Sequence, residues 1–151
     1  MPTNVVDDVA GKVITPEGPH IVRYSCVADE AFNAGDLLKY DDTNNKVIRV
    51  AATTDNLLGY AERRRNNGGA AADAVTFAAG EAVSVVALGS PCIMMVNAFG
   101  SVTRGDLAIP SATEHLVTGA GALPLAEETA GRFVHSRTGA GVVPVNLAGS
   151  A

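Results

Sequence analysis

The sequence is poor in the large side chains from which a deep hydrophobic core is usually built. Its 151 residues include no tryptophan, four phenylalanines and three tyrosines. Much of the apolar content is alanine and valine, and small side chains bury little area each. A chain of this length is expected to form one domain that buries about 68–70% of its unfolded surface. Because a shallow core leaves a small margin over chain entropy, we expect oligomerisation to add stability.

The sequence also lacks a basic excess and any long apolar run. Its formal net charge is −5 and its pI is about 5.0, whereas a nucleic-acid-binding domain is normally basic. No stretch reaches 18 consecutive apolar residues, so we expect neither a nucleic-acid nor a membrane partner. The first residues, MPTNVVDDVAG, carry acidic residues where a signal peptide has basic and apolar regions, which predicts synthesis on the cytosolic side.

Only two cysteines are present, Cys26 and Cys92, and they lie far apart in the sequence. A disulfide would need their Cα atoms within about 7 Å of each other. In a reducing compartment such isolated cysteines are usually small buried hydrophobic residues. We therefore predict two buried free thiols.

Arrangements of residues that would indicate catalysis are missing. His20, His115 and His135 have no second metal ligand two to four residues away, which disfavours a zinc site. Neither a Gly-x-Ser-x-Gly nucleophile motif nor a Walker phosphate loop occurs. The run GAGALP at 119–124 lacks the long following helix of a dinucleotide site. We therefore expect a protein that is not an enzyme and uses no cofactor or metal.

The segments that remain are typical of β-strands. Five short runs rich in β-branched residues are bounded by Gly, Pro, Asn, Asp or Ser: His20–Val27, Lys46–Ala52, Ala82–Leu88, Cys92–Phe99 and Gly141–Leu147. The dense turn signal DDTNNK at 41–46 predicts a hairpin between 37–40 and 46–50. The pattern predicts a mainly all-β fold, a small β-barrel or β-sandwich of short antiparallel strands with Gly/Ala-rich loops. At most two short helices are expected, at 29–32 and 123–131.

One tripeptide occurs twice. Gly35-Asp36-Leu37 and Gly105-Asp106-Leu107 lie 70 residues apart, and each precedes an apolar run and a polar turn. With the same offset Val47 corresponds to Val117, and a later slip of two relates Gly59–Ala61 to 131–134. Either the chain contains an internal duplication, or short-strand barrels reuse one turn in which Gly supplies positive φ and Asp closes the turn. In both cases the Gly-Asp pairs are predicted to be structural turns.

A cluster of arginines is the strongest local charge feature. Arg63, Arg64 and Arg65 precede Asn66 in a loop, 62–74, that we expect to be mobile. The cluster is either a solvated loop or a contact for an acidic partner, and exposed ion pairs add only about 0.2–1 kcal/mol each. We expect residues 1–10 to form a flexible arm, 11–147 a single barrel-like domain and 148–151 a short tail.

The order of these motifs resembles that of the small capsid decoration (cement) proteins of tailed bacteriophages, over about residues 32–147. The residues that carry the resemblance are Ala34-Gly35-Asp36, Leu58-Gly59-Tyr60-Ala61, the Gly80–Val85 strand start, Gly89 and Gly105-Asp106. The resemblance implies a β-barrel-like virion protein, made in the host cytoplasm, that binds the outer surface of an icosahedral capsid. It further implies a homotrimer that bridges major capsid protein subunits and has no catalytic residues.

Two other functions remain open on the sequence. A phage tail, fibre or carbohydrate-binding β-domain is one alternative, although sugar sites usually present more aromatic residues than this chain contains. An enzyme whose active site assembles between subunits is the other, and the isolated histidines give it little support.

Overall fold

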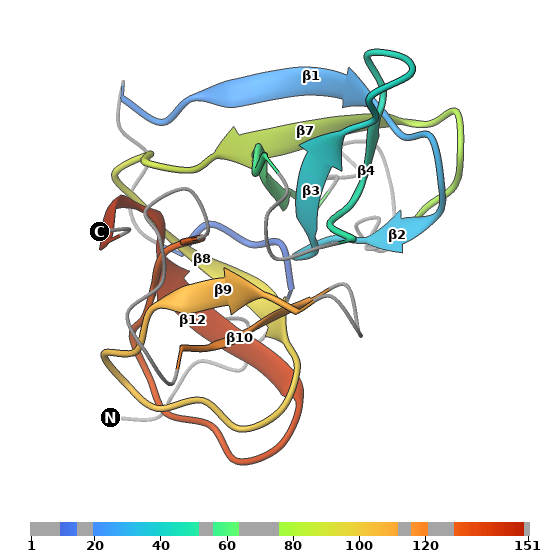
Figure 1. Cartoon of the computed structure of the whole chain (residues 1–151). Coiled ribbons are helices and arrows are strands. Elements are labelled where there is room, and N and C mark those ends of the chain that lie inside the picture. The colour runs from blue at the N-terminus through green and yellow to red at the C-terminus, as the bar shows by residue number, and fades with distance from the viewer. Residues whose placement is uncertain are drawn as a thin grey trace, which may run out of the picture.

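The computed structural model describes residues 10–14, 20–51, 56–63, 76–111, 116–120 and 129–149. The regular secondary structure of these residues is almost wholly β-strand, which confirms the predicted fold class (Figure 1). The elements follow in the order β1 (Arg23–Val27), β2 (Phe32–Asn33), β3 (Leu37–Tyr40), β4 (Val47–Arg49), β5 (Gly59–Ala61), β6 (Thr76–Phe77), β7 (Ala82–Ala87), β8 (Ile93–Ala98), β9 (Ala108–Pro110), β10 (Val117–Gly119), β11 (Arg132–Phe133), β12 (Gly141–Asn146) and the 3₁₀ turn η3 (Leu147–Gly149).

All five strands predicted from the β-branched runs are present, with their ends shortened by a few residues. The near-continuous apolar run of β7 suits a strand covered on both faces. Val83 and Val85 point to one side of this strand and Val86 to the other, and all three are buried. The alternation that this strand lacks in sequence is therefore explained by contacts on both of its faces.

The first half of the chain forms an antiparallel sheet in the order β1-β7-β5-β3-β4. This sheet closes on itself, because Ala28, directly after β1, forms a parallel bridge with Val47 of β4. The Asp29 N–H donates to the Val47 carbonyl at 2.9 Å across this closure. The result is a small five-stranded barrel.

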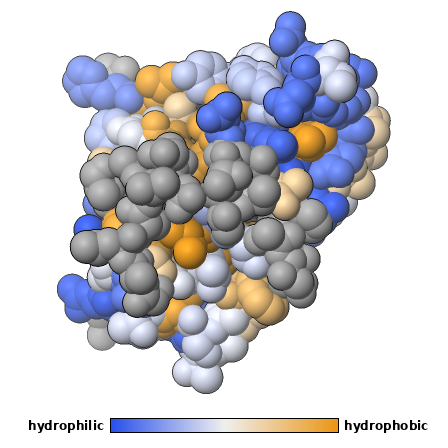
Figure 2. Space-filling model, in the orientation of Figure 1, coloured by the Kyte–Doolittle hydropathy of each residue, from blue (hydrophilic) through white to orange (hydrophobic). Residues whose placement is uncertain are grey.

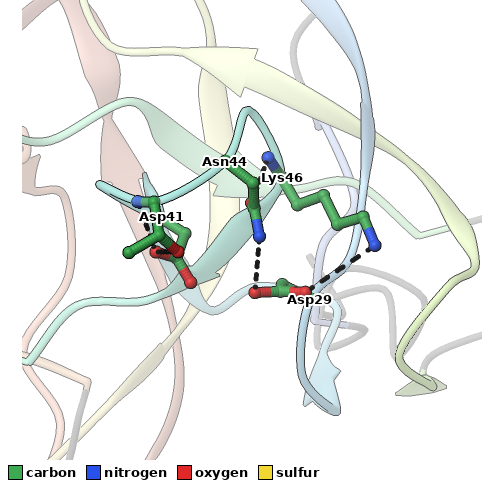
Figure 3. Close-up of polar contacts among 5 residues, drawn as sticks. Asp29, Asp41, Asn44 and Lys46 are labelled. Carbon is green, nitrogen blue, oxygen red and sulfur yellow. Dashed lines mark hydrogen bonds and ion pairs between the residues drawn. The ribbon is translucent and has the colours of Figure 1, made fainter.

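The β3–β4 hairpin that completes this barrel is held by its predicted turn (Figure 3). Asp41 Oδ1 accepts hydrogen bonds from the Thr43 amide at 2.9 Å and the Thr43 hydroxyl at 2.8 Å. Asn44 then donates to Asp29 Oδ2 at 3.2 Å, and Lys46 Nζ lies 3.8 Å from Asp29 Oδ1. The turn thereby ties the hairpin to the segment that leaves β1 and supports the closure of the barrel.

The second half of the chain forms a second five-stranded sheet, in the order β11-β12-β8-β10-β9. It closes through a bridge between Leu107, directly before β9, and Arg132 of β11. β8 and β10 run parallel where Ala98 pairs with Val117, and the rest of its pairings are antiparallel. This sheet is thus also a closed five-stranded barrel, below the first one in Figure 1.

The two barrels share one strand register. Adding 70 to the numbers of β1–β4, 72 to β5 and 60 to β6 and β7 converts most pairings of the first half of the chain into pairings of the second. The exceptions are Leu38↔Gly59, Gly59↔Ala87 and Asn33↔Thr76. Arg23↔Val86 becomes Ile93↔Asn146, and Leu38↔Arg49 becomes Ala108↔Gly119. Further matched pairs are Leu37↔Tyr60 with Leu107↔Arg132, Tyr60↔Val86 with Arg132↔Asn146, Ala28↔Val47 with Ala98↔Val117, and Phe32↔Phe77 with Val102↔Arg137.

The repeat therefore extends over the whole architecture and is more than a turn used twice. We call residues 22–87 the first repeat and residues 92–147 the second repeat. Their backbone hydrogen bonds agree as well: Val50 N donates to the Leu37 carbonyl in the first, and Ala120 N to the Leu107 carbonyl in the second.

The core has two parts. One cluster lies within the first barrel and includes Phe32 and Phe77, whose ring centroids are 5.6 Å apart. The larger cluster belongs mainly to the second barrel but also takes in Leu37, Tyr60 and Val86 from the first. The Tyr60 hydroxyl donates to the Ala130 carbonyl at 2.7 Å, which joins the two repeats inside this cluster.

The helix predicted at 29–32 is wrong. Glu30 Oε1 accepts a hydrogen bond from the Arg49 amide at 2.9 Å, and Phe32 lies in β2 opposite Phe77. These contacts, between residues 19 or more positions apart, outweigh the weak local preference for a helical turn, as tertiary contacts usually do. Of the second predicted helix, 123–131, only residues 129–131 are described, and they are not helical.

Cys26 and Cys92 are both free and buried, as predicted. Burial raises the pKa of each thiol above its ordinary value. Among the described residues there is no helix with the length and apolar character needed to span a bilayer. The predicted arm at 1–10, apart from Ala10, and most of loop 62–74 lie outside the described residues, as do 150 and 151.

Candidate functional site

The two Gly-Asp pairs occupy the same turn in the two repeats. Gly35 has φ +88° and Gly105 has φ +92°, a conformation that favours glycine. The Asp36 amide donates to the Asn33 carbonyl at 3.2 Å, and the Asp106 amide donates to the Thr103 carbonyl at 3.1 Å. A buried leucine follows each turn: Leu37 begins β3, and Leu107 directly precedes β9.

The first turn is buried at the junction of the repeats. Asp36 is 3% exposed, and its Oδ2 accepts a hydrogen bond from the Asn33 amide at 2.9 Å. Its Oδ1 accepts one from Asn97 Nδ2 of β8 at 2.8 Å. Asn97 Nδ2 also donates to the Ala34 carbonyl at 2.9 Å, and the Asn97 amide donates to the Gly35 carbonyl at 3.0 Å. One β8 residue therefore holds three successive residues of the turn.

Burial raises the pKa of the Asp36 carboxyl above its ordinary value. The hydrogen bonds from Asn33 and Asn97 and the positive charge of Arg49 oppose this shift without cancelling it. Asp36 is thus a buried carboxyl whose two oxygens both have donors, so its geometry is that of a structural link between repeats.

A cleft of about 440 Å³ opens beside this link. Its walls come from both repeats and are mostly small or neutral; the lining residues are Ala10, Asn33, Ala34, Asp36, Thr76, Asn97, Ala98, Leu116, Ala140 and Gly141. Asp36 is the one ionisable residue in this lining, and its oxygens are already used. The cleft can accommodate a small polar group, and its described walls provide amide and hydroxyl groups for hydrogen bonds.

The second turn is on the surface. Arg104 and Gly105 are exposed, and a side chain added at Gly105 would meet no atom within 4 Å. The turn is nevertheless fixed, because the Arg104 amide donates to Ser136 Oγ at 2.8 Å and Arg132 Nη1 donates to the Gly105 carbonyl at 2.6 Å. The same turn thus joins the repeats in one copy and faces solvent in the other.

The candidate partner contact at Arg63–Asn66 is only partly described. Arg63 is half-buried, and its amide donates to the Gly11 carbonyl at 3.1 Å. Arg64, Arg65 and Asn66 lie outside the described residues. The structure therefore places the start of this loop against the N-terminal segment 10–14. The preceding residue, Ala61, lies beside the first Gly-Asp turn, where its amide donates to the Asp36 carbonyl at 3.0 Å.

Two functional features escaped the sequence analysis. Asn97 is a polar residue within the apolar run CIMMVNAF, and that interruption was the available signal for its role at the junction. The other feature is a group of exposed large apolar side chains on and beside β1: Val22, Tyr24 and Tyr40, with Val27 on the opposite face of the strand. Figure 2 shows a small area of apolar surface at the upper left of the molecule, near the start of β1 in Figure 1, whereas the rest of that edge is pale or blue.

The described residues contain no group of three His, Cys, Asp or Glu side chains placed to hold a metal ion. His20 and His135 are exposed and belong to no such group, while His115 is outside the described part of the chain.

No family model and no curated protein matches this chain. A solved structure does: the N base of the head fiber protein gp8.5 of bacteriophage phi29. The TM-score is 0.51 at 14% sequence identity, and the match covers 86% of this chain and 96% of that one. The chain therefore has a fold similar to that of the head fiber base.

Proposed function

We propose that the protein is a structural component of a bacteriophage virion that binds the outer surface of an icosahedral capsid. The observation that carries this proposal is the likeness to a head fiber base over most of both chains. A fold likeness at 14% identity does not transmit a function by itself. It agrees, however, with the independent resemblance of the Gly-Asp and Gly-rich strand motifs to capsid decoration proteins.

The proposed role is to bridge neighbouring major capsid protein subunits and stabilise the shell, without catalysis or a cofactor. A homotrimer is the proposed assembly, because contacts between copies would supplement a core built mainly from Val, Ala and Leu. Many copies on one shell allow weak single contacts to hold together by multivalency. Arg63, Arg64, Arg65 and Asn66 remain the proposed contact for an acidic surface on the capsid.

The test is to mix the purified protein with expanded phage heads that lack it and to separate bound from free protein by sedimentation. We expect saturable binding, and electron microscopy of the particles should show added density at regular outer positions of the lattice. Binding to no head, or density inside the shell, would refute the proposal.

A second function follows from the same neighbour, whose structure is the base of a fiber. This chain would then anchor a longer projection to the head and would contribute little to shell stability. Heat resistance of heads with and without the protein decides between the two, because only a bridging protein should raise it.

A further inference from the structure

One end of the second barrel, where β8 begins and β9 ends, is buried. The residues at this end form what we call the second mouth: Cys92, Met94 and Pro110. Cys92 is 2% exposed, Met94 is 0% exposed and Pro110 is buried. Val13 of the N-terminal segment supplies part of the cover, because it pairs with Met94 and packs against the same core cluster. The first repeat supplies another part.

The first repeat covers the second mouth with the outer face of its sheet, which we call the junction face: Leu37, Tyr60 and Val86. Side chains alternate along a strand, so these three residues point away from the barrel interior, into which their strand neighbours point. They share one core cluster with Cys92 and Met94, and the Tyr60 hydroxyl is bonded to the second repeat at Ala130. The chain therefore contains one contact in which the outer face of one repeat closes the end of the other barrel.

The corresponding end of the first barrel is exposed. Through the 70-residue offset the second mouth corresponds to Val22, Tyr24 and Tyr40, which we call the first mouth; they are 46%, 41% and 44% exposed. Cys26 follows on the same face of β1 and belongs to the core inside the barrel, so Tyr24 lies at the barrel's end. Partial burial raises the pKa of the Tyr40 hydroxyl, and the nearby Cys26 and Tyr24 raise it further. The two tyrosines are therefore neighbours at this end.

The second repeat, in turn, leaves its outer face without a repeat to cover. The positions that correspond to the junction face form what we call the counterpart face: Leu107, Arg132 and Asn146. Leu107 is 7% exposed, whereas Asn146 is half-buried and Arg132 is exposed. Arg132 occupies the position at which the first repeat has Tyr60, which is 0% exposed. One chain thus presents both halves of the contact that it makes once internally: a barrel end on the first repeat and an outer face on the second.

We infer that the counterpart face of one copy of this chain covers the first mouth of the next copy, head to tail. A second copy is the occupant that the chain itself specifies, because the contact between its repeats uses the equivalent surface to cover the equivalent barrel end. Arg132 would take the place of Tyr60 and lie against Tyr24 and Tyr40, and a guanidinium over a tyrosine ring is a favourable contact. Tyrosine and arginine are also the residue types that concentrate binding energy at interfaces.

The contact joins two different surfaces, so it is heterologous and produces a ring when the rotation between copies closes. The inference rests on the homotrimer of the proposed function and assigns its contact surfaces, but it does not involve the capsid. Copies that associate yet bind no head would contradict the proposed capsid role and leave this contact intact. A natural chain that stays single at high concentration would contradict this contact and leave capsid binding untouched.

Substitutions on the two surfaces test the contact by sedimentation velocity of the purified chain. Tyr24→Arg places a like charge opposite Arg132, and Arg132→Glu removes the guanidinium, so each should weaken association by about tenfold or more. Phe99→Arg and Arg137→Glu are the matched controls, because both residues are exposed and lie on neither surface. They should leave association within about twofold of the natural chain. Association that is unchanged in the test variants, or lost equally in the controls, would overturn the inference.

Mixing the variants tests whether the contact runs head to tail. Tyr24→Arg keeps an intact counterpart face and Arg132→Glu keeps an intact first mouth, so an equal mixture has one intact contact for each pair of chains. The mixture should form a two-chain complex at concentrations where each variant alone is a single chain. If Tyr24→Arg does not fold, Tyr24→Ser replaces it. A mixture that remains single chains would overturn the inference, and so would Arg132→Glu that still associates alone, because two mouths would then pair with each other.

Discussion

The two repeats have the same strand register and opposite exposures at corresponding places. In the first repeat the Gly-Asp turn is buried against β8, and Val22 and Tyr24 on and beside β1 are exposed. In the second repeat the Gly-Asp turn is exposed, whereas the β8 edge is covered by residues 11–14. The repeated residues thus determine local geometry, and the residues that differ between repeats determine which surface each one hides.

Position 97 illustrates the difference. Asn97 corresponds to Val27 of the first repeat, and its side-chain amide makes the bonds that hold the buried turn. Val27 is 39% exposed and has no turn to hold. Asn97 thus supplies side-chain hydrogen bonds to the junction that valine at the equivalent position cannot make.

The largest difference between the repeats is expected from the two aspartates. Asp36→Ala should lower the free energy of unfolding by about 2–4 kcal/mol, because the Asn33 amide and the Asn97 side chain lose their buried acceptor. Asp106→Ala is the control, and it should cost less than about 1 kcal/mol because Asp106 is half-exposed. Urea denaturation of both variants measures the difference. Equal losses would mean that the junction does not depend on the Asp36–Asn97 contact.

The next largest difference is expected at the turn glycines. Alanine at positive φ costs about 1–2 kcal/mol at either position. At Gly35 a new Cβ would also lie 3.1 Å from the Ala10 Cβ and 3.1 Å from the Gly11 amide nitrogen, whereas at Gly105 it would meet open space. We expect Gly35→Ala to lower the free energy of unfolding by about 1–2 kcal/mol more than Gly105→Ala, as overpacking of a buried site does.

Matched thermal and urea unfolding of these two variants is the check. An equal effect at both glycines would show that residues 10–14 move away from the first turn at little cost.

These contrasts also show what the sequence could and could not reveal. The strands and the β3–β4 hairpin follow from local patterns, since β-branched runs and the DDTNNK turn act over a few residues. The repeat was visible in Gly-Asp-Leu and in Val47 and Val117. The closure of each sheet into a barrel could not be predicted from the sequence, because it depends on single bridges between distant residues such as Ala28 and Val47.

The junction was hidden for the same reason. The fragment GKVI at 11–14 is too short for its sequence to predict that it pairs with β8, more than 75 residues away. Asn97 differs from its neighbours in polarity, but only the fold shows that its partners are Ala34 and Asp36. The predicted helix at 29–32 failed because Phe32 gains its main contact from Phe77.

A smaller effect is expected from the tyrosine that joins the two repeats. Tyr60→Phe removes the hydroxyl that donates to the Ala130 carbonyl and should cost about 1–2 kcal/mol of unfolding free energy. Tyr24→Phe is the control, because Tyr24 is 41% exposed and should change the free energy by less than about 0.5 kcal/mol. Chemical denaturation measures both. If the two changes are equivalent, the repeats are held together by apolar contacts and the Tyr60 hydrogen bond adds nothing.

The smallest effect is expected in the pH dependence of stability. Because the pKa of Asp36 is higher in the folded protein than in the unfolded chain, the folded state binds more protons in the interval between the two values. Its contribution to stability is therefore full below the unfolded pKa near 3.8 and declines as the pH rises through the folded pKa. Other carboxyl groups add their own slopes, so the informative quantity is the difference between the natural chain and Asp36→Asn.

We expect the natural chain to lose stability relative to Asp36→Asn as the pH rises from about 4 to 7, by about 1.4 kcal/mol for each unit of pKa difference. Asp106→Asn is the control and should show a much flatter difference. Urea denaturation at a series of pH values provides the data. A difference that grows in favour of the natural chain over this range would mean that the hydrogen bonds from Asn33 and Asn97 outweigh the burial of the carboxylate. In that case the junction would be strongest when Asp36 is charged.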